Sequence, residues 1–173
     1  MPDNPITRNQ ADQAILEALN QLIEVVAKLR SPDQGCPWDL AQTPQTLIPY
    51  MIEEAYEVVH ALRSEDQNAI VEELGDLLLQ VVLQAQIAKD YGHFSLQEVA
   101  QGITEKLIRR HPHVFSNVEV KNSEEVRENW LKIKAKEKGE SLEVAQLLSR
   151  KLAHYHRTLP PLMASHKISS KAA

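Results

Sequence analysis

The sequence predicts an all-α fold, and three observations support this. Only 5 of its 173 residues are glycine, and long stretches lack both Gly and Pro, which favours helices over strands and turns. Apolar residues recur at intervals of three and four residues, the spacing of one face of a helix. Residue pairs typical of helix starts stand at two of the boundaries. We see no strong strand pattern and no internal repeat, so we expect helices throughout.

The first expected helix spans about residues 11–30 and follows a flexible lead-in at residues 1–10. It ends before Pro32, because a proline biases the preceding residue away from helical geometry. The segment from Pro32 to Pro44 is then expected to be a loop carrying Gly35-Cys36-Pro37-Trp38-Asp39. The apolar residues of the helix follow the helical spacing; they are Ile15, Leu19, Leu22, Ile23, Val26 and Leu29.

A second and a third helix are expected at about residues 46–63 and 66–89. Pro49 would lie in the first turn of the second helix, where a missing N–H costs little. Ser64 and Gln67, three residues apart, resemble a capping box before the third helix. The centre of the third helix is apolar almost all round, a pattern typical of a helix buried on most sides. In so small a protein we expect that burial to require a second subunit.

A fourth helix is expected from the Ser95 and Glu98 capping-box pair to about Arg110. Tyr91-Gly92 ends the helix before it, and His111-Pro112-His113 ends the fourth helix itself.

The helical pattern continues to about residue 138 and then weakens. Ser123 is expected to cap a fifth, charge-rich helix at residues 124–138. Beyond Gly139 we expect a short helix at residues 140–151 and a break at Leu159-Pro160-Pro161. The chain is therefore divided into a lead-in at 1–10, a helical domain at 11–138, and a partly mobile segment or linker at 139–173.

Composition and charge argue against several classes of protein. The net charge of −5 disfavours a general nucleic-acid binder, which would carry a basic surface. The segment Met1–Gln10 lacks the apolar core of a signal peptide, and no apolar run reaches membrane-spanning length. Cys36 is the single cysteine and can form no internal disulfide, which suits a reducing compartment. We expect a cytoplasmic protein with no membrane partner and no stable nucleic-acid binding.

Two acidic patterns stand on consecutive expected helices, and they are the most informative feature of the sequence. Residues three or four apart share a helix face, so Glu54 and Glu57 point together, as do Glu73 and Asp76. A short turn makes the two helices antiparallel neighbours, and the two pairs can then converge. Glu53, four residues before Glu57, can reach the same rim.

Converging carboxylates repel one another unless a cation or protons neutralise them. Hard oxygen ligands suit Mg²⁺ or Mn²⁺, and a site made of carboxylates leaves positions open for water and phosphate oxygens. A metal in such a site can clamp phosphates and activate water, while a spare carboxylate acts as general base. The alternative is a solvated acidic face with ordinary ion pairs. That alternative is our expectation for Glu72, whose side chain would point away from the pair.

Basic residues that could hold phosphates lie at the end of the fourth helix. Lys106 and Arg110 share a face there, next to Arg109, and arginine suits bidentate phosphate contacts. These cations could equally complement the helix dipole. The fifth helix adds lysines among which spacing alone selects none; they are Lys132, Lys134, Lys136 and Lys138.

Both tryptophans could stack on a nucleobase, although core packing is their more common role. Trp38 lies in the expected Gly/Pro loop, and Trp130 lies on the fifth helix.

Together these residues resemble the MazG family of nucleoside triphosphate pyrophosphohydrolases, in order over about residues 15–138. The matching stretches are Gly35-Cys36-Pro37-Trp38-Asp39, Glu53-Glu54-Ala55-Tyr56-Glu57, Glu72-Glu73-Leu74-Gly75-Asp76-Leu77-Leu78, Arg109-Arg110-His111-Pro112-His113-Val114-Phe115 and Trp130-Leu131-Lys132-Ile133-Lys134.

The resemblance implies an all-alpha NTP pyrophosphatase fold with four-helix-bundle packing completed in a homodimer. It implies Mg²⁺, which Mn²⁺ can replace, with hydrolysis of a ribo- or deoxyribonucleoside triphosphate to a monophosphate and pyrophosphate. The residues implied for the metal are Glu54, Glu57, Glu73 and Asp76, with Glu53 aiding metal binding or water activation. Arg109, Arg110 and Lys134 match the family's basic residues and are implied as triphosphate contacts.

Proteins of this family often carry two related domains, and this chain resembles the first of them with the connecting segment. Two other functions stay open. Glu57 and His60 form a Glu-x-x-His pattern used by di-iron and di-manganese bundle proteins, but the third helix offers Glu-x-x-Asp instead. A non-catalytic helical dimer that binds nucleotide or recruits partners is the other alternative.

Overall fold

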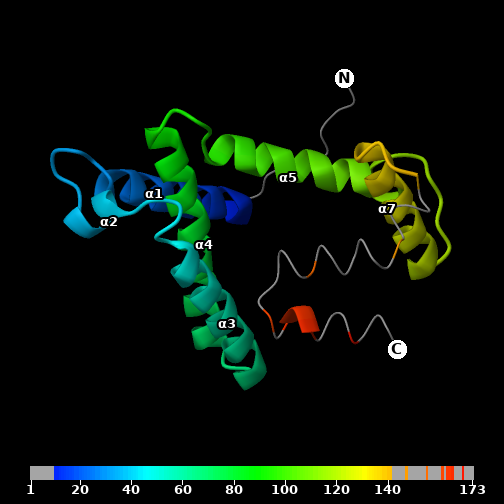
Figure 1. The fold of residues 1–173 in the computed structure, drawn as a ribbon, viewed down its shortest axis with the longest axis horizontal. Helices are drawn as coiled ribbons and strands as arrows, with labels where there is room; N and C mark the ends of the chain where they lie inside the picture. The colour runs from blue at the N-terminus through cyan, green and yellow to red at the C-terminus, as the bar shows by residue number, and fades with distance from the viewer. Residues whose placement is uncertain are drawn as a thin grey trace. The chain divides into compact units, whose positions relative to one another are not determined.

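The structure is a computed structural model that describes residues 10–141 and, beyond them, residues 147, 155, 161, 163–165 and 169. Residues 10–141 contain helices and no strand, which confirms the all-α prediction (Figure 1). The helices are α1 (Gln10–Leu29), α2 (Pro37–Ala41), α3 (Ile48–Ser64), α4 (Gln67–Asp90), α5 (Leu96–Arg110), α6 (Pro112–Phe115) and α7 (Ser123–Glu137).

The chain divides into two compact units, Met1–Gln101 and Gly102–Ala173. The first unit contains α1 to α4 and the first residues of α5, and the second contains the rest of α5 with α6 and α7. No helix among the described residues is both long and apolar enough to cross a membrane.

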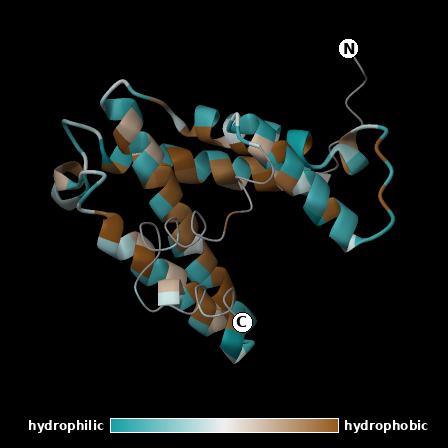
Figure 2. Ribbon diagram, turned by 45° about the vertical axis from the view of Figure 1, so that its right-hand side comes forward, coloured by the Kyte–Doolittle hydropathy of each residue, from teal (hydrophilic) through white to brown (hydrophobic). Residues whose placement is uncertain are grey.

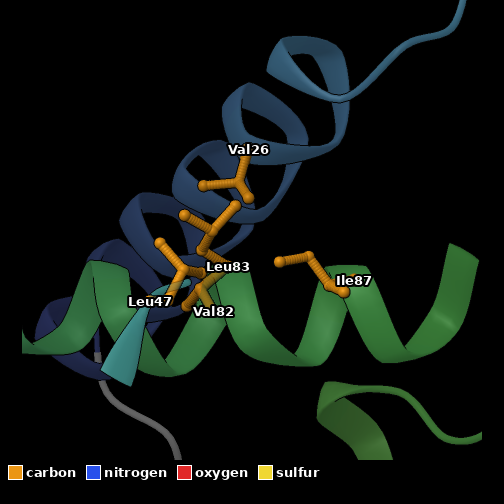
Figure 3. Packing of buried hydrophobic residues seen from close by; sticks show 5 residues of the cluster. All are labelled: Val26, Leu47, Val82, Leu83 and Ile87. Atoms are coloured by element: carbon orange, nitrogen blue, oxygen red, sulfur yellow. The ribbon is translucent and has the colours of Figure 1, made fainter. Parts of the chain in front are cut away.

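The core of the first unit lies where α1 and α4 pack together. Figure 3 shows Val26 of α1 above Val82, Leu83 and Ile87 of α4, with Leu47 inserted from the segment before α3. Leu47 and Ile87 have no exposed surface. Burial of such side chains stabilises the fold by about 1.5–3 kcal/mol each, so this cluster anchors α4.

Arg30 joins α1 to the segment that follows it. Its Nε donates to Asp90 Oδ2 at 2.6 Å, and its Nη1 donates to the backbone oxygen of Asp39. The side chain of Arg30 is only 6% exposed. The carboxylate and the carbonyl offset part of the cost of burying the guanidinium. The segment is therefore held firmly against the end of α1.

Part of the segment expected to be a loop is helical, which corrects the sequence prediction. Pro37 is in the first turn of α2, where a backbone N–H has no partner within the helix, and its fixed φ suits a helix. Before it, Gly35 and Cys36 donate backbone hydrogen bonds to Ser31 and Leu29, both at 2.8 Å. Trp38 and Asp39 consequently lie on a short helix rather than on a loop.

The turn between α3 and α4 makes them antiparallel neighbours, which Figure 1 shows side by side. Asp66 caps α4, because its side chain accepts hydrogen bonds from the amides of Asn68 and Ala69. Ser64 does not form the expected capping box with Gln67. It is the last residue of α3, and its hydroxyl donates to the carbonyl of Ala61.

Burial along α4 is uneven. Its second half is buried against α1, with Val82, Leu83, Ala85, Ile87 and Ala88 inside. Its first half exposes apolar side chains, and Figure 2 shows hydrophobic residues along the α3–α4 pair. Val71 is 72% exposed and Leu74 is 48% exposed. Within one chain, therefore, only the second half of α4 is buried on most sides as the sequence predicted.

The second unit contains α7, whose cap differs by one residue from the prediction. Asn122, not Ser123, is the cap, and its side-chain oxygen accepts from the amide of Glu125.

The start of α5, in the first unit, forms as expected, since Ser95 donates to Glu98 from both its amide and its hydroxyl. The short helix expected at 140–151 and the break at Leu159-Pro160-Pro161 lie largely outside the described residues.

Candidate active site

Three carboxylates from α3 and α4 meet in the first unit. One oxygen from each of Glu54, Glu57 and Glu73 lies within 4.8 Å of the others. Glu54 and Glu57 share a face of α3 because they are three residues apart. The antiparallel packing of α4 then presents Glu73 to that face. The convergence predicted from spacing is thus observed for these three residues.

Burial and neighbouring negative charges both disfavour the ionised forms of Glu54 and Glu73. Partial burial raises the pKa of Glu54, and the carboxylates of Asp76, Glu57 and Glu73 raise it further. Desolvation also raises the pKa of Glu73, followed by the charges of its acidic neighbours, while His60 nearby opposes that rise. Desolvation is the largest cause of each shift, and repulsion between neighbouring carboxylates adds to it.

Asp76 is half-buried on α4, one turn after Glu73, and its charge acts on both Glu54 and Glu73. Its oxygens are not part of the group within 4.8 Å. Glu53 is exposed on α3, and Glu72 is exposed on α4, as expected for a solvated residue. A metal-binding role for Asp76 and an accessory role for Glu53 stay predictions.

The donor set fits a divalent metal ion. Three carboxylates from two rigid helices supply hard oxygen ligands, the type that Mg²⁺ and Mn²⁺ prefer. A cation there would also remove the repulsion that raises the pKa values of Glu54 and Glu73. The chemistry and the electrostatics of these residues therefore agree on the same kind of ligand.

An exposed aromatic pair lies beside the acidic face of α3. Trp38 of α2 meets Tyr50 edge to face, with ring centroids 5.7 Å apart. The two side chains are 49% and 38% exposed. Tyr50 stands four residues before Glu54, about 6 Å along the same face of the helix. Trp38 was a candidate from sequence, whereas nothing in the sequence analysis selected Tyr50.

The predicted basic residues of the second unit form a cluster between α5 and α7. Arg109 and Arg110 of α5 both bind the carboxylate of Glu137 on α7. Arg110 and Lys134 also lie over the ring of Trp130, at 5.1 and 5.0 Å from its centroid. Burial lowers the pKa of Lys134, and the nearby cations lower it further. Spacing alone could not select Lys134 among its neighbours, but the structure places it in this cluster.

Lys106 is exposed on α5, one turn before Arg110. It shares a helix face with Arg110, as the four-residue spacing predicted.

Known protein families and structures match this chain. The family model of the MazG nucleotide pyrophosphohydrolase domain matches residues 42–115. A mazG-related protein from Thermotoga maritima, known from its crystal structure, is 31% identical. The match has a TM-score of 0.56 and covers 97% of that protein and 66% of this chain. This chain belongs to the MazG family. The family resemblance seen in the sequence is thereby confirmed, and so is the all-α fold.

Curated relatives match most of this MazG chain. A protein of Escherichia coli named nucleoside triphosphate pyrophosphohydrolase is 40% identical over 91% of this chain and 58% of its own length. A Thermotoga maritima protein named nucleoside triphosphate pyrophosphohydrolase/pyrophosphatase MazG is 40% identical over 88% of this chain and 56% of its own length. YabN of Bacillus subtilis, named as uncharacterized, is 47% identical over 83% of this chain and 28% of its own length. The chain thus spans between a quarter and three fifths of these relatives.

The matched MazG region contains all the predicted acidic residues and the basic residues of α5. Sequence reasoning missed Arg30, Tyr50 and Glu137. Arg30 and Glu137 act through partners far away in sequence. The signal that could have found Tyr50 was its four-residue spacing from Glu54 on an amphipathic helix.

Proposed function

We propose that this MazG chain hydrolyses nucleoside triphosphates to a nucleoside monophosphate and pyrophosphate, with Mg²⁺ as the metal and Mn²⁺ as a substitute. The observation that carries the proposal is the convergence of Glu54, Glu57 and Glu73 on two packed helices. The names of the Escherichia coli and Thermotoga maritima relatives support the same activity. The single cysteine, Cys36, suits a cytoplasmic setting for this reaction.

The four predicted ligands have distinct places in the proposed site. Glu54, Glu57 and Glu73 would hold the metal, and half-buried Asp76 would complete the set from the next turn of α4. A bound divalent cation supplies charge neutralisation and Lewis acidity toward phosphate oxygens. Glu53, on the same helix as Glu57, would aid metal binding or accept the proton of the attacking water.

The basic and aromatic residues would bind the rest of the substrate. We propose that Arg109, Arg110 and Lys134 contact the triphosphate, with Lys106 adding positive charge. Arginine suits this role because its planar fork matches phosphate oxygens. Trp38 would contact the nucleobase, and its exposed edge-to-face pairing with Tyr50 supports that role.

The direct test is to incubate the protein with each canonical NTP and dNTP, in Mg²⁺ or in EDTA, and to quantify pyrophosphate and orthophosphate separately. We expect pyrophosphate release that needs the metal and is lost in Glu57→Ala. Glu17→Ala, at an exposed position of α1, is the matched control and should keep full activity. Orthophosphate as the main product, or release unaffected by Glu57→Ala, would contradict the proposal.

We also propose that a second copy of the chain covers the exposed apolar surface of α3 and α4. Val71, Leu74 and Leu78 of α4 are exposed, and so are Ile52 and Val59 of α3. Large exposed apolar patches are rare on a monomer and are typical of an interface between subunits, and the exposed residues of α4 recur at the spacing of one helix face. A helix pair that packs against its own copy completes a four-helix bundle, as the family resemblance implies.

The oligomeric state tests this proposal. Light scattering after size exclusion should give the mass of a dimer for the wild type and of a monomer for Leu78→Arg. Val114→Arg, which adds the same charge at an exposed position of α6, should remain dimeric. A monomeric wild type at micromolar concentration would refute the interface.

A further inference from the structure

Glu137 is a charged residue that the proposed reaction has not yet used, and it lies between two arginines. The Nε of Arg109 donates to Glu137 Oε1 at 2.6 Å. The Nη2 of Arg110 donates to Glu137 Oε2 at 2.6 Å, with a longer bond from its Nε at 3.2 Å. The Nε of Arg110 also lies 3.3 Å from Oε1, so Oε1 accepts from both arginines and Oε2 accepts from Arg110. The two arginines lower the pKa of Glu137 to about 2, so it stays ionised at neutral pH.

The bonds to Glu137 use only part of each guanidinium. An arginine has five N–H groups in a planar fork. Arg109 gives Glu137 only its Nε–H, so its two terminal nitrogens take no part in this contact, and its side chain is 50% exposed. Arg110 gives Glu137 its Nε and Nη2 but not its Nη1, and its side chain is 16% exposed. The carboxylate therefore orients the two groups without saturating them.

Trp130 fixes the other side of the same cluster. The guanidinium of Arg110 lies over its ring, and so does the ammonium of Lys134. Cations held over an indole are attracted by its negative face. The cluster then contains three cations and the single carboxylate of Glu137 and keeps a net positive charge. Burial lowers the pKa of Lys134, and the charges of Lys138 and Arg110 lower it further, while Glu137 opposes them.

We infer that Glu137 is a positioning residue that holds Arg109 and Arg110 side by side as one fork for phosphate oxygens. Without a carboxylate between them, two neighbouring guanidiniums repel each other and would separate. Preorganised donors bind an anion without the cost of ordering them first. The inference rests on the proposed function, since it concerns the same triphosphate contacts. The inference adds Glu137 to these contacts, a residue that the proposed function does not include.

The opposite possibility is that Glu137 imitates a phosphate and blocks the arginines. The geometry argues against it, because Arg109 contacts Glu137 through Nε, not through its terminal nitrogens, and its side chain is 50% exposed. The two possibilities predict changes of opposite sign when the charge of Glu137 is removed. A positioning residue makes anion binding weaker when it is lost, and a blocking residue makes it tighter.

The test uses inorganic tripolyphosphate in EDTA, so that binding is measured without the metal site and without turnover. In a Trp38→Phe background Trp130 is the only tryptophan, and its fluorescence reports on the cluster directly. We expect Glu137→Gln to weaken tripolyphosphate binding about tenfold, in line with the loss of a charge-assisted hydrogen bond. Glu137→Asp, which keeps the charge, should recover part of the affinity. Glu128→Gln, on the same helix and paired only weakly with Lys132 at 3.8 Å, is the control and should bind like the parent.

Kinetics separate positioning from a general loss of structure. With a nucleoside triphosphate and Mg²⁺, Glu137→Gln should raise KM with little change in kcat, because the acidic cluster is intact. If Glu137→Gln loses helical circular dichroism, the tripolyphosphate titration of Glu137→Asp decides instead. An affinity of Glu137→Asp no better than that of Glu137→Gln would overturn the inference. Unchanged or tighter binding by a folded Glu137→Gln protein would overturn it, and so would a parent protein that binds no tripolyphosphate. A parent that binds tripolyphosphate but releases no pyrophosphate would refute the proposed function and leave this inference standing.

Discussion

Replacing Glu54 with glutamine should stabilise the metal-free protein and weaken its response to a divalent metal. Glu54 stands in the acidic group with Glu57 and Glu73, and burial together with its acidic neighbours raises its pKa. A carboxyl whose pKa is raised by folding contributes stability only while it is protonated. That stability is present below the unfolded value of 4.5 and is lost as the pH rises through the folded pKa. Glutamine cannot ionise, so Glu54→Gln should be more stable than wild type at pH 7.5 but not at pH 4.

The size of the gain follows from the separation of the charges. Two unit charges 4.8 Å apart, the limit for Glu54 and Glu57, repel by about 0.9 kcal/mol in water and about 3.5 kcal/mol at an effective dielectric constant of 20. Glu57 is exposed, so solvent screening favours the lower value. We therefore expect a gain of about 1 kcal/mol, which raises Tm by about 2–4 °C in a protein of this size.

Thermal unfolding at low ionic strength, in EDTA and then in excess Mg²⁺, measures both effects. Wild type should gain stability from Mg²⁺, and Glu54→Gln should gain much less, because a ligand that binds only the folded state stabilises it by mass action. Glu17→Gln removes one negative charge from an exposed part of α1 and controls for the change in net charge. The reasoning is refuted if Glu54→Gln is no more stable than wild type in EDTA while Glu17→Gln behaves like wild type.

Three further predictions concern the scaffold. Leu47 has no exposed surface, so Leu47→Ala should lower the free energy of unfolding, measured in urea, by about 2–5 kcal/mol. A loss below about 1 kcal/mol would contradict this and mean that neighbouring side chains fill the cavity. Gly35→Ala should lower Tm, because a Cβ there would lie 2.5 Å from the carbonyl oxygen of Ser31. Gly102→Ala, where a Cβ meets no neighbouring atom, should increase the free energy of unfolding by up to about 1 kcal/mol. A Gly35→Ala protein more stable than Gly102→Ala would contradict both expectations. Hydrogen bonds from Ser95 lower the pKa of Glu98, so its contribution is present above 4.5 and is lost as the pH falls through the folded pKa. Urea titrations should find Glu98→Gln less stable than wild type at pH 7, with the gap closing in acid, and a gap independent of pH would count against this.

Helix positions could be predicted because hydrophobic spacing is a local property of the chain. The five long helices lie within two residues of the expected bounds. The caps were predicted less well, since Asp66 and Asn122 took the roles expected of Ser64 and Ser123. A cap depends on which residue first leaves helical geometry, and several neighbouring polar side chains compete for that position.

The acidic site was predictable as far as helical spacing reaches. Three-residue spacing and a short turn were enough to bring Glu54, Glu57 and Glu73 together. They could not show that Asp76 would stand slightly apart. An aspartate is one methylene shorter than a glutamate, so its oxygens extend less far from α4. The reach of a side chain across a groove depends on the distance between two helices, which the spacing along one helix does not contain.

The sequence by itself determined the all-α class, the order of the helices and the acidic residues that face one another, because each follows from periodicity within a helix or across a short turn. The tertiary structure alone decided that Tyr50 pairs with Trp38, that Arg30 binds Asp90, and that Glu137 joins the two arginines of α5. These contacts join different elements of the fold, and whether two such residues meet depends on how helices pack. Packing is set by the sum of many weak apolar contacts, so no local motif in the chain records it.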